Sequence, residues 1–425
     1  MKLLLQGIPK VKVLTKTAGI YLGTNLINSA MPFLLIPVLT HYLTPKDYGI
    51  VAMFQVLVGI IGNFTGLGVQ SAIGRQYFEK ESIDFPKYIS SCLFIMLLSS
   101  ILVSMALLAF SKIIMSVTSF PSEYLWCVLS VCIGQSLVMV VLVLWQVQGK
   151  AAVYGAFQIL LTLVNMTCTL LFVIMFKMGW QGVVNAQVIA YILFSIIGIT
   201  ILFKDRMISL SYVNDYVRHA IKYSIPLIPH NIGAWVMCMM DRVMITNMVG
   251  LADTGVYAVG AQIGMGIALI QNSFNQAWTP WLFGQLKEDK ISIKLVIVKI
   301  TYLYDFLLLI LALLLAAVAP WFIDHFVGKA FAGANKYVIW IALGYAFNGM
   351  YKMVANYIFY TGHTYVLACI TFTTAVISLI IMYFLIRIYG AVGAAVGLML
   401  SLLLSFILTS VFSARLYKMP WTLKE

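Results

Sequence analysis

The sequence predicts an all-α polytopic membrane protein, and three features of its composition carry that prediction. Of its 425 residues, 62% are hydrophobic and only 10% are charged, against about 25% in an ordinary soluble domain. The apolar residues form unbroken runs of the roughly 20 residues that a helix needs to cross a bilayer. Too little polar surface remains to cover a water-facing globule. Disorder requires low hydrophobicity, and the strands of an outer-membrane barrel alternate apolar and polar residues. A soluble enzyme, a disordered chain and an outer-membrane barrel are therefore excluded.

Twelve apolar spans with short connections fit into the chain. Several exceed about 20 residues, which implies tilt or projection beyond the bilayer. The connections are too short to form an extramembrane domain, so chemistry is expected within the bundle or at its mouths. The expected spans are 15–43, 48–74, 87–111, 121–147, 153–176, 180–203, 217–246, 252–282, 295–318, 335–361, 363–387 and 391–415.

The lysines and arginines predict the orientation of these spans. With the N-terminus in the cytoplasm, 19 of the 27 basic residues face the cytoplasm and 6 face the opposite side. The remaining two, Arg242 and Lys352, lie within spans. Both termini are therefore expected in the cytoplasm, and the net charge of +13 is mostly a topology signal. No compact basic domain or basic helix with interleaved aromatics appears, so nucleic acid is not an expected partner.

The sequence carries no enzyme, metal or cofactor signature. The six cysteines all lie in apolar runs without a CxxC or Cys/His cluster, so neither a disulfide framework nor a metal site is expected. A glycine-rich phosphate loop, an HExxH motif and a metal-binding carboxylate cluster are all missing. Lysines precede the first apolar run, and no small-residue cleavage site follows it, so we expect a retained helix and no signal peptide.

An internal repeat is expected, with six spans in each of residues 1–210 and 211–425. Three residues after the first span match three after the seventh at one offset of 206: Asp47, Gly49 and Ala52 match Asp253, Gly255 and Ala258. Six is an even number, so both halves insert with the same orientation and are related by a pseudo-two-fold axis along the membrane normal. This arrangement suits a transporter with a central cavity.

Five titratable groups lie inside the expected spans: Asp241, Arg242, Asp305, Lys352 and His230. Insertion of a charged side chain at such depth costs about 2.5–3.5 kcal/mol of free energy on insertion scales, so its presence indicates a function or a pairing partner. Asp241 and Arg242 are neighbours that point about 100° apart, and we do not expect them to pair directly. Either they serve a structural role, or Arg242 contacts an anion while Asp241 sets its geometry. Asp305 either neutralises Lys352 or accepts a proton.

Polar side chains recur along two of the later spans. The tenth span carries a stripe that faces either a cavity or another polar helix, formed by Tyr345, Asn348, Lys352, Asn356 and Tyr360. The eighth span carries amides and indoles that suit sugar groups or, alternatively, an interfacial aromatic belt with packing amides: Gln271, Asn272, Asn275, Gln276, Trp278 and Trp281. The first span shows a weaker signal of the same kind in Asn25 and Asn28.

Prolines interrupt the first and seventh spans. Pro32 and Pro37 lie in the outer part of the first, and Pro226 and Pro229 lie in the inner part of the seventh, beside His230. Each proline removes a hydrogen bond of the helix and favours a kink. The kinks are either purely structural or hinges that open and close the cavity.

Several stretches of the chain resemble a known family, the polysaccharide biosynthesis transporters. These Wzx-type O-antigen flippases belong to the multidrug/oligosaccharidyl-lipid/polysaccharide exporter superfamily. The likeness spans nearly the whole chain. In the first half, the stretches that carry it are Leu43 to Gly49 and Gly66 to Arg75. In the second half, one stretch begins with Ser224 to His230 and continues to Asp241 and Arg242, and another begins with Gly255 to Tyr257 and continues to Phe274 to Pro280.

The resemblance implies a V-shaped fold of two bundles around a cationic cavity. It also implies transport, by alternating access, of an undecaprenyl-diphosphate-linked oligosaccharide from the cytoplasmic to the periplasmic leaflet of a bacterial inner membrane. The resemblance further implies coupling to protons or sodium, with a polysaccharide polymerase and a chain-length regulator as partners. Lys16, Arg75, Arg242 and Lys352 are then the candidates for binding the diphosphate, the first two at the cytoplasmic mouth. The chain departs from the family in having few cations in the middle of its spans.

Two other functions remain open at this point. A cation-coupled drug exporter of the same superfamily would be expected to use acidic residues, of which the spans hold only Asp241 and Asp305. A membrane oligosaccharide polymerase should show a sizeable periplasmic loop. Neither the identity of the glycan nor the coupling ion can be read from the residues.

Overall fold

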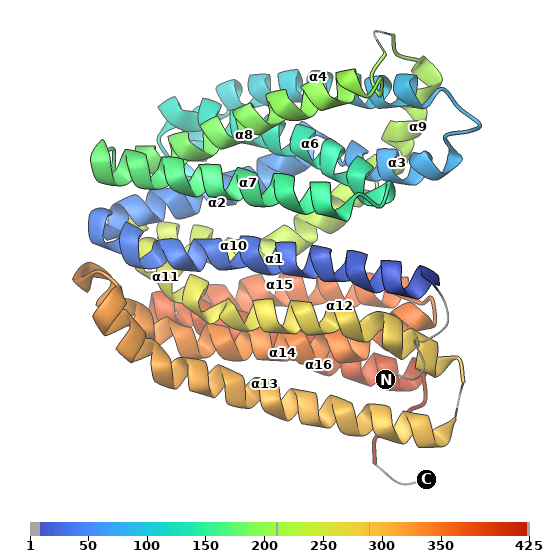
Figure 1. Ribbon diagram of the computed structural model, residues 1–425. Helices are drawn as coiled ribbons and strands as arrows, with labels where there is room; N and C mark the ends of the chain where they lie inside the picture. Colours follow the sequence, from blue (N-terminus) through green and yellow to red (C-terminus); the bar gives the residue numbers. More distant parts are fainter. Residues whose placement is uncertain (1–8, 210, 289, 423–425) are drawn as a thin grey trace. The chain divides into compact units, whose positions relative to one another are not determined.

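The computed structural model describes residues 9–209, 211–288 and 290–422, which form helices joined by short connections and contain no strand (Figure 1). In this part of the chain, ten helical segments are long and apolar enough to cross a membrane. Helices α10 (Leu227–Met248) and α14 (Asn335–Tyr360) are not among the ten, although each lies in a predicted span. Both carry the polar residues singled out above, which make them less apolar. The all-α membrane fold is confirmed, and the count of twelve spans stays a prediction.

The chain divides into two compact units. Unit 1 comprises Met1–Leu35 and Met53–Ile232, and unit 2 comprises Ile36–Ala52 and Gly233–Glu425. The chain therefore passes from one unit to the other within α1, α2 and α10. The division of the sequence into repeats 1–210 and 211–425 stays a prediction.

Unit 1 is built around α6, which packs against α3, α4, α7 and α8. Its core is apolar, with Cys92, Val140 and Ile73 fully buried. A π-helical turn, Leu171–Met175, extends α7. The helices that contribute to this unit are α1 (Pro9–Tyr42), α2 (Pro45–Thr65), α3 (Val69–Gln76), α4 (Phe85–Ala109), α5 (Ser111–Thr118), α6 (Leu125–Val147), α7 (Ala151–Leu170), α8 (Trp180–Lys204) and α9 (Asn214–Ser224).

Unit 2 is built around α14, which packs against α11, α12, α13 and α16. The helix with the polar stripe is therefore the central helix of this unit. A 3-10 turn, Lys329–Ala334, precedes it. Besides α10 and α14, the helices are α11 (Leu251–Gly264), α12 (Gly266–Leu286), α13 (Ile291–Phe326), α15 (Thr364–Tyr389) and α16 (Ala391–Leu416).

Three predicted spans are interrupted where single continuous helices were expected. The span 48–74 breaks after Thr65, because Leu67 (φ 49°) and Gly68 (φ 70°) adopt left-handed backbone conformations that end a right-handed helix. The span 217–246 consists of α9 and α10, with Pro226 between them, which removes a helix hydrogen bond. The span 252–282 is interrupted at Met265, although its two parts count as one candidate span.

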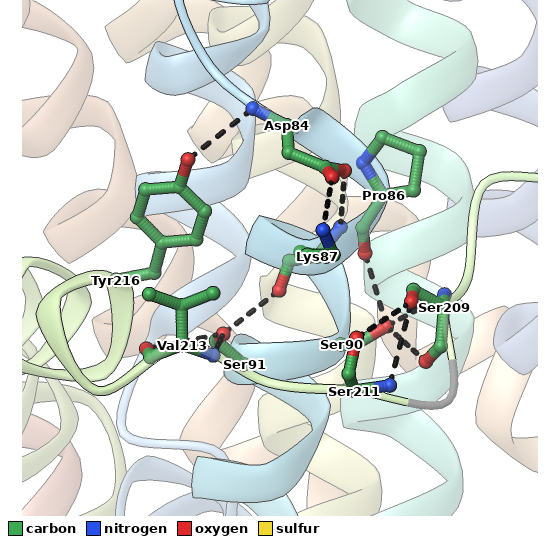
Figure 2. A network of polar contacts seen from close by, with 9 residues as sticks. All are labelled: Asp84, Pro86, Lys87, Ser90, Ser91, Ser209, Ser211, Val213 and Tyr216. Carbon is green, nitrogen blue, oxygen red and sulfur yellow. Dashed lines mark hydrogen bonds and ion pairs between the residues drawn. The ribbon is translucent and has the colours of Figure 1, made fainter.

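The linker that follows α8 is fixed to α4 by hydrogen bonds (Figure 2). Ser90 Oγ donates to the carbonyl oxygen of Ser209 at 2.7 Å and accepts from its N–H at 2.9 Å. Ser91 Oγ accepts from the N–H of Val213 at 3.0 Å. The side chains of α4 therefore hold Ser209 and Val213 of this linker against that helix, within unit 1.

Asp84 caps the beginning of α4 beside the same linker. Its backbone N–H donates to the hydroxyl of Tyr216 at 3.2 Å. The Lys87 ammonium lies 2.8 Å from Asp84 Oδ2, and the Lys87 N–H also donates to the carboxylate. Both hydrogen bonds favour the ionised form and hold the pKa of the Asp84 carboxyl below its usual value.

The capping box at the start of α2 explains the Thr-Pro-x-Asp motif. Thr44 Oγ1 donates to Asp47 Oδ2 at 2.7 Å and accepts from the Asp47 N–H at 3.2 Å. Pro45 occupies the first helical position, where a missing N–H costs nothing. This motif fixes the turn between α1 and α2.

That turn packs into unit 2 through close backbone contacts. Tyr48 OH donates to Gln262 Oε1 at 2.9 Å, and the N–H of Gly328 donates to Thr40 Oγ1 at 3.1 Å. A Cβ atom on Gly255 would collide with the backbone of Pro45 and Gly49. Glycine is therefore required where α2 crosses α11. Gly49 and Gly255 are also the pair matched in the expected repeat.

We predict that Gly255→Ala lowers the free energy of unfolding by about 1–3 kcal/mol, because the added methyl group meets backbone that cannot move aside. Gly284→Ala is the matched control, since nothing lies within 4 Å of a Cβ at that position. Alanine should leave stability unchanged or raise it there. Thermal unfolding of the purified protein in detergent measures both variants. Equal melting temperatures for the two would contradict the close helix crossing.

Candidate functional site

A polar seam joins α12 and α14 inside the apolar unit 2. Its residues on α14 lie four positions apart, and Asn272, Asn275 and Thr279 on α12 lie three and four positions apart, which places each set on one face of its helix, with Gln271 beside the second set. Partners pair in ascending order on both helices, so the two helices run in the same direction. We call this set the α12–α14 seam; it consists of Gln271, Asn272, Asn275 and Thr279 on α12 and Asn348, Lys352 and Asn356 on α14.

The first half of the seam contains the predicted cation. Gln271 Nε2 donates to Asn348 Oδ1 at 3.0 Å, and Lys352 Nζ donates to Asn272 Oδ1. Gln271 is 1% exposed, and its Oε1 has no hydrogen-bond partner among the described residues. The stripe on α14 thus faces another polar helix, which was one of the two expected alternatives.

The second half of the seam consists of neutral groups. Asn356 Nδ2 donates to Asn275 Oδ1 at 3.1 Å, and Thr279 Oγ1 donates to Asn356 Oδ1 at 3.2 Å. Asn356 is buried. Its amide is satisfied on both sides by α12, which accounts for its presence in the centre of an apolar bundle.

Asp241 and Arg242 form a second polar cluster, and they pair directly. Arg242 Nη1 lies 2.9 Å from Asp241 Oδ1 and also donates to the carbonyl oxygen of Cys238 at 3.0 Å. Tyr257 OH donates to Asp241 Oδ2 at 2.6 Å. The expectation that these neighbours do not pair was wrong. The 100° separation describes their Cβ directions, whereas the long arginine side chain bends back along the helix surface.

Cys238 and Tyr345 bring the two clusters into one neighbourhood. The exposed Cys238 lies within electrostatic range of Asp241, Arg242 and Lys352. Tyr345, on the stripe of α14, lies within such range of Asp241 and Arg242. Two cations and one carboxylate therefore share a region formed by α10, α11 and α14, and its charge is net positive.

Aromatic side chains of α12 lie against α13. The rings of Phe274 and Tyr304 stack with centroids 4.2 Å apart, and Trp278 follows 5.7 Å from Phe274. Trp278 is buried in the apolar core, whereas Trp281 is 37% exposed. Trp278 therefore serves packing, and Trp281 keeps a ring face available.

Asp305 is not paired with Lys352. The ion pairs of the described residues are Lys87–Asp84, Arg242–Asp241 and Lys290–Glu288. The Oδ1 atom of Asp305 is buried and has no hydrogen-bond partner among the residues that the structure describes. Of the two expected roles, neutralising Lys352 does not occur in this structure.

The remaining predicted residues lie in other places. Arg75, in the last turn of α3 in unit 1, is exposed, and its guanidinium lies 5.3 Å from the Tyr223 ring centroid. The side chains of Lys16 and His230 lie outside the described part of the chain. Four prolines that were expected as hinges lie in or beside α1 and α10: Pro32, Pro37, Pro226 and Pro229.

Sequence reasoning omitted three residues of these clusters from the site. Thr279 continues the spacing of Asn272 and Asn275 on α12, and that spacing is the signal that identified the stripe on α14. No comparable signal marks Cys238 or Tyr257, which are brought to the pair by the packing of α10 and α11. No group of three His, Cys, Asp or Glu side chains within the described ranges is placed to hold a metal ion.

A comparison with protein families matches residues 14–285, more than half of the chain, to the family described as polysaccharide biosynthesis protein. The chain belongs to this family. A membrane protein of Haemophilus influenzae is 25% identical over 363 residues, covering 83% of this chain and 85% of the relative. A protein of the Lsg locus from the same organism is also 25% identical over 362 residues, covering 82% and 85%.

Solved structures share the fold. An inward-facing multidrug resistance MATE family transporter of the MOP superfamily matches with a TM-score of 0.74 at 14% identity, covering 91% of this chain and 94% of the other. A MATE structure in the straight conformation matches with a TM-score of 0.62 at 16% identity, covering 97% of each chain. The chain thus combines membership of the polysaccharide biosynthesis protein family with the all-α fold of these MATE transporters.

We predict that Asp241→Leu destabilises the protein by about 3–5 kcal/mol, because it leaves the buried Arg242 cation without its carboxylate. The double variant Asp241→Leu/Arg242→Leu should recover part of that loss. Asp324→Leu, at an exposed position on α13, serves as the control. Thermal unfolding in detergent provides the measurement, and a double variant no more stable than the single one would refute the pairing.

Cys238 offers a native probe of the positive region. An anionic methanethiosulfonate should modify it several-fold faster than a cationic reagent of similar size, since opposite charges attract across a short distance. Lys352→Gln should bring the ratio of rates toward one. Comparing two reagents on one thiol cancels any change in the thiolate fraction. Labelling of membranes in a Cys369→Ser background, followed by mass spectrometry, gives both rates. Equal rates of modification by the two reagents at Cys238, with Lys352 in place, would contradict a net positive field.

Proposed function

We propose that the protein translocates an undecaprenyl-diphosphate-linked oligosaccharide from the cytoplasmic to the periplasmic leaflet of a bacterial inner membrane, by alternating access. The observation that carries the proposal is the net positive region of unit 2, where Arg242 and Lys352 share a neighbourhood inside an apolar bundle. A lipid diphosphate loses its hydration when it enters such a bundle. Cationic side chains replace part of that hydration.

Each of the two cations donates a hydrogen bond to an oxygen that a phosphate oxygen could replace as acceptor. Arg242 donates to Asp241, and Lys352 donates to Asn272. Phosphate oxygens accept the same hydrogen bonds, and an arginine binds them in a bidentate fashion. We infer that the diphosphate exchanges with these acceptors, and that Asp241 fixes the position of Arg242 when the site is empty.

The neutral amides of the α12–α14 seam are the proposed contacts for sugar hydroxyls in unit 2. They comprise Gln271, Asn275, Asn348 and Asn356. Gln271 offers an oxygen without a protein partner. The exposed ring face of Trp281 is available for stacking on a sugar. The polyprenyl tail stays in the surrounding lipid.

Entry and coupling are assigned to residues at other positions. We propose that Lys16 and Arg75 attract the diphosphate at the cytoplasmic mouth, where both termini lie. Proton or sodium coupling is assigned to Asp305, whose unpartnered oxygen is free to accept a proton or a cation, with Asp241 and His230 as further candidates. A polysaccharide polymerase and a chain-length regulator are the proposed partner proteins.

The prolines are proposed as hinges on the basis of where the chain changes unit. In α1 it passes from unit 1 to unit 2 between Leu35 and Ile36, which Pro32 and Pro37 flank. In α10 it passes between Ile232 and Gly233, shortly after Pro226 and Pro229. A proline removes a helix hydrogen bond and makes bending easier. Bending at these positions would move one unit against the other.

Lys352→Ala should reduce surface glycan at least fivefold in cells that depend on this chain, while the amount of membrane-inserted protein stays normal. Arg242→Ala should reduce surface glycan at least fivefold per amount of inserted protein, a ratio that is needed because this variant also leaves the buried Asp241 without its cation. Arg242→Lys and Lys352→Arg should retain part of the export, because they keep the positive charge. Immunoblots of isolated membranes control for the amount of protein. Normal export by the alanine variants would overturn the anion-contact assignment. Unchanged glycan together with lost resistance to a cationic drug would favour a drug exporter.

A further inference from the structure

A second polar contact surface lies in unit 1, where the inner part of α1 meets α7. Four residues of α7 lie on one face at helical spacing, opposite three of α1. We call this set the α1–α7 face; it consists of Tyr21, Thr24 and Asn28 on α1 and Tyr154, Gln158, Thr162 and Asn165 on α7.

The two helices touch along this face. The rings of Tyr21 and Tyr154 meet edge to face with centroids 5.0 Å apart. Thr162 Oγ1 donates to Asn28 Oδ1 at 2.9 Å. Between these contacts, Gly155 brings the backbone of α7 so close that a Cβ there would collide with the side chain of Thr24.

Four polar atoms on the α1–α7 face are buried and have no hydrogen-bond partner among the described residues. They are Tyr21 OH, Asn28 Nδ2, Gln158 Oε1 and Asn165 Oδ1. Leaving such a group unsatisfied costs about 1–3 kcal/mol, and the hydrocarbon interior of a membrane offers no substitute. The four atoms comprise one donor, two acceptors and one hydroxyl that does both.

Several other polar side chains of unit 1 are satisfied locally, whereas Gln148 Oε1 and Ser224 Oγ also lack a partner among the described residues. Ser99 Oγ donates to the carbonyl oxygen of Thr65 at 2.9 Å, and Ser195 Oγ donates to that of Tyr191 at 2.5 Å. Gln55 Nε2 donates to Gln187 Oε1 at 2.8 Å. Of the six buried polar atoms without a partner among the described residues of unit 1, four therefore lie together on the α1–α7 face.

We propose that the α1–α7 face binds hydroxyl groups of the transported glycan. A sugar hydroxyl both donates and accepts, which matches the mixture of donors and acceptors on this face. The face carries no charge, so it suits sugars, whereas the cations of unit 2 suit the diphosphate. The proposal rests on the proposed function and adds a glycan contact in unit 1.

The double variant Gln158→Leu/Asn165→Leu tests this assignment. The two side-chain oxygens have no protein partner, so leucine removes no protein hydrogen bond there, and the melting temperature should equal or exceed that of the wild type. Surface glycan in cells that depend on this chain should nevertheless fall at least fivefold. Thr167→Leu, at an exposed position of the same helix, should change neither quantity. Asn165→Ser, which keeps a hydrogen-bonding group, should export more than Asn165→Leu.

Two outcomes would overturn the proposal. Normal export by the double variant would remove the glycan contact, and a melting temperature that falls in step with export would assign the face to packing. Both leave the proposed function standing if the wild-type chain restores surface glycan in the same cells. If the wild-type chain fails to restore glycan, the proposed function fails, and this proposal fails with it.

Discussion

A hydrogen-bonding side chain inside a membrane bundle has only protein to bond with, because lipid tails offer neither donors nor acceptors. This constraint determines the arrangement of unit 2. Asn356 is tolerated in the core because Asn275 and Thr279 satisfy its amide. Asp241 is tolerated because Arg242 and Tyr257 occupy both of its oxygens. The central position of α14 follows, since a helix with a polar stripe is stable only beside helices that complement it.

The same constraint separates two kinds of recognition. In unit 2, each cation already donates a hydrogen bond to a protein oxygen. An incoming anion therefore replaces one acceptor by another, and binding gains only the difference between the free energies of the two interactions. Such exchange favours moderate affinity, which a transporter needs because it must also release its cargo. In unit 1, four polar atoms of the α1–α7 face have no hydrogen-bond partner among the described residues, so a ligand hydroxyl that reaches them adds hydrogen bonds without replacing any. The two units thus differ in whether ligand binding replaces existing protein hydrogen bonds or adds new ones.

Residue spacing revealed the polar stripe on α14, and applied to the amides of α12 it also identifies Thr279. Which helices adjoin is a matter of tertiary packing, so the pairing of the two stripes was not predictable. The glycines around Leu67 marked the end of α2, and Pro226 marked the break before α10, but both were absorbed into longer apolar runs. The contact between Asp241 and Arg242 was misjudged because helical geometry constrains Cβ directions more tightly than it constrains long side chains. The assignment of residues 36–52 to unit 2 leaves no local trace in the sequence.

That last feature bears on how the chain is made. Residues of the turn between α1 and α2 pack against Gln262, 214 residues after Tyr48, and against Gly328, 288 residues after Thr40, so the turn is synthesised long before its partners. Unit 2 therefore cannot complete its packing during synthesis unless residues 36–52, which are made early, remain accessible in the membrane. Loop closure over such a distance is slow compared with local helix pairing. The two halves of the chain consequently depend on each other to fold. A chain that ends after α9 leaves the α1–α2 turn without the helices against which it packs. A fragment that starts at α10 lacks the turn that packs against Gly255.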